Sequence, residues 1–291
     1  MFNGSFVAIV TPFKKNLDID YECLSDLIEF HIDSGTSGFV PAGTTGEAAT
    51  LSESEHYSLV EYVIKRVKNR VPVIAGAGGN NTAAVIERIN KLKKLGPDAF
   101  LVVTPYYNKP SQEGLYGHYK SIARETNVPI ILYNVPGRTG VNLLPDTVAR
   151  LSEIKQIVGI KEASGNIVQV SEILAKTPKK FCVLSGEDSL VLPILSIGGK
   201  GVISASANVI PADMADLIRE FDSGRIKVAQ SLHKKMLPVC QAMFIETNPV
   251  PVKTALAWMD KIEFAVRLPL APMINSNKEK LRNILKENKV I

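Results

Sequence analysis

The sequence predicts an α/β protein folded as a (β/α)8 TIM barrel with a C-terminal helical appendage. Three observations predict it: eight short apolar runs rich in β-branched residues, helical patterns between successive runs, and a length of 291 residues. A strand followed by a helix, repeated about eight times, is the pattern expected for this barrel. Such barrels reach roughly 250 residues as a single domain. An open, doubly wound sheet is the best alternative.

The predicted strands are continuous apolar runs, without the alternation of apolar and polar residues seen in half-exposed strands. Continuous runs are typical of strands that are buried on both faces of a parallel sheet. In chain order, the strands are predicted at residues 6–10, 38–40, 71–75, 99–103, 129–133, 156–160, 181–184 and 201–204.

Helices are predicted between the strands from the spacing of apolar residues and from their end signals. Two patterns follow i, i+3, i+4 and i+7 closely, namely Val60, Val63, Ile64 and Val67, and Met214, Leu217, Ile218 and Phe221. Ser52 with Glu55, and Ser276 with Glu279, read as capping boxes. Pro211 suits the first turn of its helix.

The barrel is predicted to span residues 1–224 and to carry the active site. Residues 225–291 are predicted to be a helical region packed on the barrel, because their apolar residues keep helical spacing and no Ser/Gly-rich linker precedes them. They are too few and too dependent on a neighbouring surface to suggest an independent fold.

Composition excludes several classes of protein. A share of 45% hydrophobic and 22% charged residues excludes disordered and fibrous chains, and no apolar run is long enough for a membrane helix. The net charge of +5 lies mostly in basic clusters on predicted helices, without an aromatic–basic module, so no nucleic-acid partner is expected. Three scattered cysteines and no visible secretory signal favour a cytoplasmic location.

Barrel enzymes carry their chemistry at the C-terminal ends of the strands. After the second predicted strand, the turn at residues 43–47 brackets Thr44 and Thr45 with glycines, so backbone and hydroxyls together suit a small anion. No Gly-Lys-Ser/Thr follows, which excludes a phosphate P-loop. A plain tight turn leading into the capped helix is an equally good interpretation.

Lys161 follows the sixth predicted strand directly. A buried ammonium is costly and tends to lose its proton, and a neutral lysine can attack a carbonyl to form a Schiff base. The structural alternatives are a lysine that extends out of the barrel mouth or one that pairs with Glu162.

The fifth predicted strand ends at Tyr133, with Arg138 just beyond it. A phenol at this place could move protons, and the arginine could hold a carboxylate. Taken singly, each residue is better explained structurally, as a packed core tyrosine and a surface arginine. The histidines have no metal-ligand spacing, so a structural zinc is not expected. The half fingerprint at residues 76–80 lacks its third glycine and is a weak signal for a dinucleotide.

With these residues in place, the chain resembles the dihydrodipicolinate synthase and N-acetylneuraminate lyase family of pyruvate-dependent class I aldolases. The resemblance runs essentially from end to end, and Arg138 with the Tyr106–Tyr107 pair resembles the synthase branch. Its motifs lie at residues 7–12, 43–47, 104–108, 114–116, 133–140, 159–165, 248–253 and 267–269.

The resemblance implies a lyase that joins pyruvate to L-aspartate 4-semialdehyde, giving 4-hydroxy-tetrahydrodipicolinate on the diaminopimelate route to lysine. Lys161 would form the Schiff base, and Tyr133, Thr44 and a neighbouring subunit's Tyr107 would relay protons. The remaining roles implied are carboxylate binding for pyruvate and for the semialdehyde, and lining of the pocket, by Thr45, Arg138, Gly186 and Ile203. A homotetramer built as a dimer of dimers is implied too, and so is a reaction that requires no metal or organic cofactor.

The resemblance also implies a feedback site for L-lysine at a dimer interface. Its residues here would be Ala49, His56, Asn80 and Tyr106. The chain departs from the lysine-sensitive pattern, because Glu53 stands in place of a histidine and Ala84 in place of a glutamate. Weak or absent inhibition by lysine is therefore expected.

Two alternatives stay open at this point. A sister aldolase would use the same Lys161 chemistry on a 2-keto-3-deoxy sugar acid or on N-acetylneuraminate. A non-catalytic barrel would bind a small acid or a partner protein and keep Lys161 for structure alone. The combination of Lys161 with a proton relay and Arg138 argues against the second, because a binding protein needs no relay.

Overall fold

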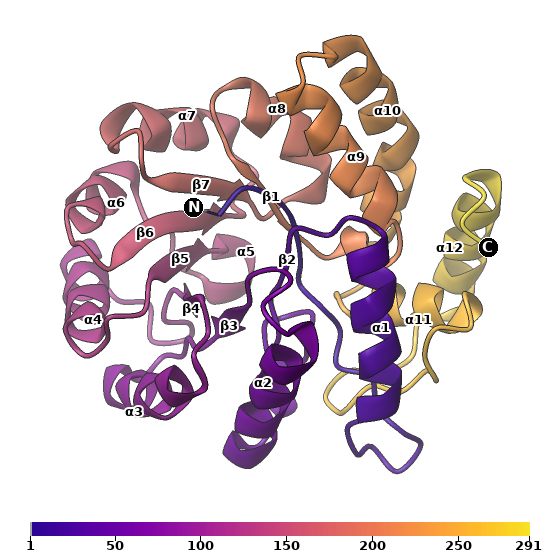
Figure 1. Ribbon diagram of the computed structural model, residues 1–291, viewed down its shortest axis with the longest axis horizontal. Coiled ribbons are helices and arrows are strands. Elements are labelled where there is room, and N and C mark those ends of the chain that lie inside the picture. Colours follow the sequence, from indigo (N-terminus) through magenta and orange to yellow (C-terminus); the bar gives the residue numbers. More distant parts are fainter. Residues whose placement is uncertain (1) are drawn as a thin grey trace.

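Eight parallel strands close into a barrel in the computed structural model, which describes residues 2–291 (Figure 1). The hydrogen-bonded order is β2-β1-β8-β7-β6-β5-β4-β3, and a parallel bridge between Phe39 and Val73 joins its two ends. The predicted barrel is confirmed, and the open sheet is excluded. The strands are β1 (Gly4–Val7), β2 (Gly38–Phe39), β3 (Ile74–Gly76), β4 (Ala99–Val103), β5 (Ile130–Asn134), β6 (Ile157–Glu162), β7 (Cys182–Ser185) and β8 (Gly201–Ser204).

Each strand buries side chains on both of its faces. One set points into the barrel, where Phe6, Ile74, Leu101 and Ile203 belong to a single cluster. The alternate set packs outward into a larger cluster shared with the helices. This double burial explains why the strand sequences are continuous apolar runs.

Helices surround the barrel, as Figure 1 shows. The capping box of Ser52 and Glu55 is confirmed at the start of α2, and Pro211 is confirmed in the first turn of α9. The helices of this part of the chain are α1 (Tyr21–Asp33), α2 (Glu53–Val67), α3 (Thr82–Leu92), α4 (Gln112–Arg124), α5 (Pro136–Thr139), α6 (Pro145–Ser152), α7 (Ile167–Lys176), α8 (Val191–Ser196) and α9 (Pro211–Asp222).

The C-terminal region is helical, with α10 (Ile226–Ala242), α11 (Val250–Trp258) and α12 (Asn275–Glu287). The predicted capping box of Ser276 and Glu279 is wrong, because α12 begins at Asn275 and places Ser276 inside its first turn. The carboxylate of Glu246 takes over this role. It accepts hydrogen bonds from the backbone N–H of Ile274 at 3.1 Å and from Asn277 Nδ2 at 2.9 Å.

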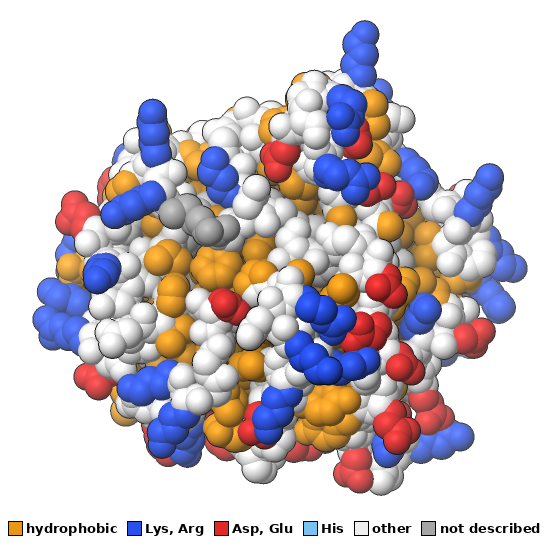
Figure 2. Space-filling view, in the orientation of Figure 1, with side chains coloured by type: hydrophobic (Ala, Val, Ile, Leu, Met, Phe, Trp, Pro, Cys, Tyr) orange, Lys and Arg blue, Asp and Glu red, His pale blue; other side chains and the backbone are white. Residues whose placement is uncertain are grey.

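Within residues 2–291, no helix is both long enough and apolar enough to cross a bilayer. Figure 2 shows one face of the molecule, on which Lys and Arg side chains lie both around the edge and across the middle, interspersed with Asp and Glu. No continuous patch of one sign covers this face. This distribution agrees with basic clusters that are solvated on helix surfaces.

Candidate active site

Lys161 lies inside β6, one residue before its end, and not after the strand as expected from the sequence. It is paired in register with Tyr133 of β5 and Leu184 of β7, so these side chains share the C-terminal end of the barrel. Lys161 is buried, and its Nζ is 4.5 Å from the centre of the Tyr133 ring. Gly186 leaves room for it, because a Cβ there would meet Lys161 Cε at 2.9 Å.

Lys161 has no carboxylate partner among residues 2–291, since none of their ion pairs includes it. Glu162 is the next residue on the strand and therefore faces the opposite side. Its buried carboxylate accepts hydrogen bonds from the Ser164 N–H at 2.6 Å, Gln169 Nε2 at 2.7 Å and Asn134 Nδ2 at 3.1 Å. Pairing of Lys161 with Glu162 is thus excluded, and an amine remains at the barrel mouth.

The turn that carries Thr44 and Thr45 is tied down on two sides. Thr11 Oγ1 donates a hydrogen bond to the carbonyl of Gly46 at 2.7 Å. Asn248 Nδ2 donates to Thr45 Oγ1 at 3.0 Å. Thr45 is buried, whereas Thr44 is partly exposed. The turn is therefore more than a passive connection, because Asn248 fixes the Thr45 hydroxyl and Thr11 holds the Gly46 carbonyl.

Glu47 ends this turn with a left-handed φ of 54° and forms a buried ion pair that the sequence analysis did not identify. Its Oε1 lies 2.5 Å from Nζ of Lys253, which also donates to the carbonyl of Ala265 at 2.9 Å. Burial lowers the pKa of Lys253 to about 8, and Glu47 opposes the shift. A lysine in the otherwise apolar start of α11 was the available signal.

A cavity of about 460 Å³ opens at this end of the barrel. Tyr133 from β5, Thr44 from the turn and Arg138 from α5 lie in its wall. The Arg138 guanidinium donates to the carbonyl of Asn248 at 3.1 Å, and Asn248 lines the same cavity. The cavity wall therefore combines a phenol, hydroxyls and a cation, and the amine of Lys161 lies against the ring of Tyr133. This arrangement is suited to carbonyl chemistry on carboxylic acids.

Some predicted site residues lie outside the cavity wall. Lys161, Thr45, Gly186 and Ile203 do not line it, and Ile203 is fully buried in the cluster inside the barrel. Tyr107 has a left-handed φ of 73° and is 90% exposed, so its ring points away from its own chain. Within the described residues, no hydrogen bond joins Tyr107, Thr44 and Tyr133, so the relay is not assembled in one subunit alone.

The predicted lysine site is only partly brought together. Ala49, His56 and Tyr106 line the cavity, whereas Asn80 does not; its carbonyl accepts from Asn108 Nδ2 at 3.0 Å. His56 is buried, with Nε2 2.7 Å from the carbonyl of Gly76.

Glu53 is already engaged by Arg88, which also lines the cavity. The Arg88 guanidinium hydrogen-bonds this carboxylate and lowers its pKa below the usual range. Glu53 therefore has its charge balanced before any effector arrives.

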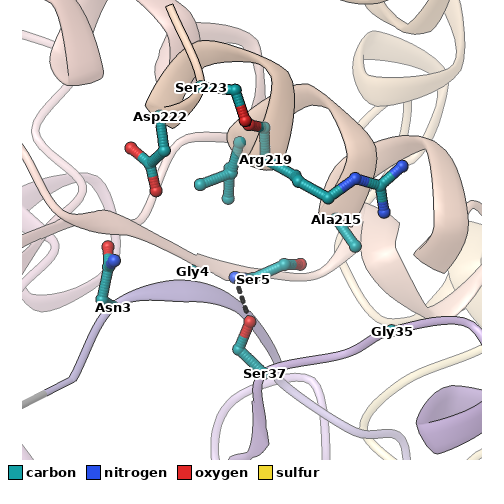
Figure 3. A pocket seen from close by; sticks show the side chains of 10 residues that line it. Asn3, Gly4, Ser5, Gly35, Ser37, Ala215, Arg219, Asp222 and Ser223 are labelled. Carbon is teal, nitrogen blue, oxygen red and sulfur yellow. Dashed lines mark hydrogen bonds between the residues drawn. The ribbon is translucent and has the colours of Figure 1, made fainter.

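A second cavity, of about 390 Å³, lies at the opposite end of the barrel (Figure 3). Asn3, Ser5 and Ser37 line one side of it and Asp222 lies across from them, with the Ser5 N–H donating to Ser37 Oγ at 3.1 Å. Arg219 in its wall is paired with Asp216 at 2.7 Å. Since active sites of these barrels occur at the C-terminal ends of the strands, this cavity is not the catalytic one.

Comparison with known proteins adds independent findings. The model of the dihydrodipicolinate synthetase family matches residues 1–288. The 4-hydroxy-tetrahydrodipicolinate synthase of Thermodesulfovibrio yellowstonii is 57% identical over 286 residues, covering 98% of each chain. The solved dihydrodipicolinate synthase of Thermotoga maritima is 44% identical, with a TM-score of 0.98 and full coverage of both chains. The Acinetobacter baumannii synthase, solved with pyruvate, gives the same three values. The chain therefore belongs to the dihydrodipicolinate synthetase family.

Proposed function

We propose that the chain is a lyase that condenses pyruvate with L-aspartate 4-semialdehyde to give 4-hydroxy-tetrahydrodipicolinate. This reaction supplies the diaminopimelate route to lysine. Full-length relatives at 53–57% identity carry the name of this enzyme, and one solved relative was crystallised with pyruvate. Arg138 favours this substrate over the sugar acids of the sister aldolases, because a guanidinium matches the carboxylate of the semialdehyde.

The observation that carries the proposal is Lys161, a buried amine at the barrel mouth without a carboxylate partner among the described residues. Its nitrogen attacks C2 of pyruvate, and loss of water leaves an iminium. The iminium withdraws electrons, so the pyruvate methyl group loses a proton and becomes a nucleophilic enamine.

The other predicted residues receive roles that their positions support. Tyr133, whose ring lies against Lys161, would move protons during imine formation, through Thr44 and through Tyr107 of a second subunit. Thr45 would hold the pyruvate carboxylate. Ile203 and Gly186 would shape the floor of the pocket around the imine.

Arg138 would hold the carboxylate of the second substrate at the cavity wall. The enamine carbon adds to the aldehyde, forming the new carbon–carbon bond. The substrate amine then attacks the imine carbon and displaces Lys161, which closes the ring and regenerates the enzyme. The overall reaction releases one molecule of water, which leaves when the first imine forms, and no atom of either substrate stays on the protein.

Reduction with borohydride in the presence of pyruvate tests the chemistry directly. We expect intact mass measurement to show one reduced pyruvyl group per chain, and peptide mapping to place it on Lys161. A Lys161→Ala variant is the control and should gain no mass. Absence of the adduct in the wild-type protein would falsify both aldolase hypotheses.

A substrate panel separates the synthase from a sister aldolase. The wild-type protein should consume aspartate semialdehyde and leave 2-keto-3-deoxy sugar acids and N-acetylneuraminate unchanged. Arg138→Ala should trap pyruvate normally but lose roughly 10- to 100-fold in kcat/KM for the semialdehyde, because one charged hydrogen-bonding group is removed. Cleavage of a sugar acid at a comparable rate would overturn the assignment.

We further propose a cytoplasmic homotetramer in which residues 1–224 form the barrel and residues 225–291 complete it. The exposed ring of Tyr107 supports association, because an aromatic side chain at 90% exposure on a left-handed residue gains from being covered by a second subunit. Sedimentation analysis gives the assembly. Tyr107→Ala should lower the activity. It should also weaken the assembly, so that the variant dissociates at a higher protein concentration than the wild type when it is diluted.

A further inference from the structure

Asn248 connects the two groups to which the proposed function assigns carboxylate binding. Its side chain donates from Nδ2 to Thr45 Oγ1 at 3.0 Å, and its backbone carbonyl accepts from Arg138 at 3.1 Å. Asn248 itself is only 5% exposed and lies in the wall of the cavity. One residue of the C-terminal region thus contacts both binding groups of the barrel.

The direction of the first hydrogen bond matters for the chemistry. A threonine hydroxyl has one proton to donate and two lone pairs that accept. Because Asn248 Nδ2 fills one lone pair, the Thr45 proton stays available for an acceptor such as a carboxylate oxygen. Asn248 Oδ1 is buried and has no hydrogen-bond partner among the described residues, so the amide is held on this side through its nitrogen alone.

Both neighbouring segments hold Asn248 firmly. Pro249, the next residue, accepts from the Lys253 N–H at 2.8 Å at the start of α11, and Lys253 is the partner of Glu47 in the same turn as Thr45. On the other side, Glu246 caps α12. Such support is what a positioning group needs, because its own orientation must not drift.

We propose that Asn248 is a positioning residue that orients the Thr45 hydroxyl toward the pyruvate carboxylate. The inference rests on the proposed function, since it assumes that pyruvate binds at Thr45. The side chain acts on the pyruvate half of the site alone. The contact with Arg138 comes from the backbone and is kept in any side-chain variant.

The test is the pyruvate concentration that gives half-maximal borohydride trapping on Lys161, measured without the second substrate. Asn248→Ala should raise this concentration about 3- to 10-fold, the equivalent of one lost neutral hydrogen bond. The KM for the semialdehyde should change less than about twofold. Asn248→Asp has the same shape but would accept the Thr45 proton and repel the substrate carboxylate, so its shift should exceed that of Asn248→Ala.

Two controls separate positioning from general damage. Asn277→Ala removes the bond to Glu246 in the adjoining segment and should leave the pyruvate dependence unchanged. In a Thr45→Val background, Asn248→Ala should add no further shift, because the hydroxyl that it orients is gone.

The outcomes are distinguishable. If both Asn248 variants reach half-maximal trapping at the same pyruvate concentration as the wild type, the inference is overturned and the proposed function stays intact. Equal shifts for both substrates would also overturn it, since they would indicate a disturbed segment. If the wild-type protein traps no pyruvate, the proposed function fails and the inference with it.

Discussion

Lys161 and Lys253 are both buried, but the regions around them differ in whether they provide a carboxylate partner for the amine. Lys253 is fully enclosed, with Glu47 at 2.5 Å and the carbonyl of Ala265 at 2.9 Å. Lys161 has the ring of Tyr133 at 4.5 Å and no carboxylate within ion-pair distance in the described part of the chain. A buried ammonium is costly unless it is paired. The presence or absence of a partner therefore separates a lysine that holds the structure from one that is available for reaction.

The comparison predicts opposite effects for the same substitution at the two sites. Lys161→Met should abolish activity, on the order of 10⁴-fold or more, because the nucleophile is lost. It should not lower the free energy of unfolding, since an unpaired amine is replaced by an apolar chain of similar length. Steady-state kinetics and urea unfolding check the two halves. A variant that is both inactive and clearly destabilised would contradict the distinction.

Lys253→Met should instead destabilise the protein by about 3–5 kcal/mol, because Glu47 is left buried without its counter-charge. The double variant Glu47→Gln/Lys253→Met should recover most of this loss, since neither charge remains. Urea unfolding of the single and double variants gives the measurement. If the double variant is no more stable than the single one, the ion pair is not the reason for the loss.

His31 isolates the effect of burial from that of pairing. It is fully buried, and desolvation lowers its pKa from 6.5 to about 3. Below pH 6.5 the unfolded chain takes up a proton that the native His31 refuses until about pH 3, so stability falls as the pH falls through this window.

Between pH 7 and pH 5, His31 should account for a loss of about 2 kcal/mol. His31→Gln should remove this part of the slope, as unfolding at the two pH values can measure. His118, whose pKa burial lowers to about 4, contributes in the same direction and stays in both proteins. Identical slopes for the wild type and the variant would contradict this explanation.

The smallest effect is expected for inhibition by free L-lysine, whose ammonium groups would need a carboxylate partner on the protein. Glu53 is held by Arg88, and Ala84 offers no carboxylate, so we expect little inhibition. Initial rates against lysine concentration test this. Strong inhibition at sub-millimolar lysine would show that other groups bind the effector ammonium, and Arg88→Ala would then reveal whether freeing Glu53 strengthens it.

The barrel was predictable from the sequence because double burial leaves continuous apolar runs, which need no knowledge of distant contacts. The positions of Lys161 and Tyr133 near the barrel mouth were predictable for the same reason, since each interrupts or ends such a run. The start of α12 was not, because its cap is Glu246, which is distant in sequence and leaves no local pattern at Ser276.

Contacts between distant segments account for the remaining gaps. Lys253 is an isolated charge in an apolar helix, and only the folded chain shows that Glu47 is its partner. Asn248 and Thr45 are separated by 203 residues, and nothing in either segment indicates that one donates to the other. The sequence alone thus indicates which residues could react, but not which distant residues hold them in place.

The contacts of Asn248 and Lys253 with the turn at residues 43–47 have a consequence for synthesis of the protein. The ribosome releases all eight strands well before it releases Asn248 and Lys253. Until then, Glu47 and Thr45 lack the partners that they have in the finished molecule. A nascent chain that has every strand is therefore still without the contacts that secure the turn at residues 43–47, which only the C-terminal region supplies.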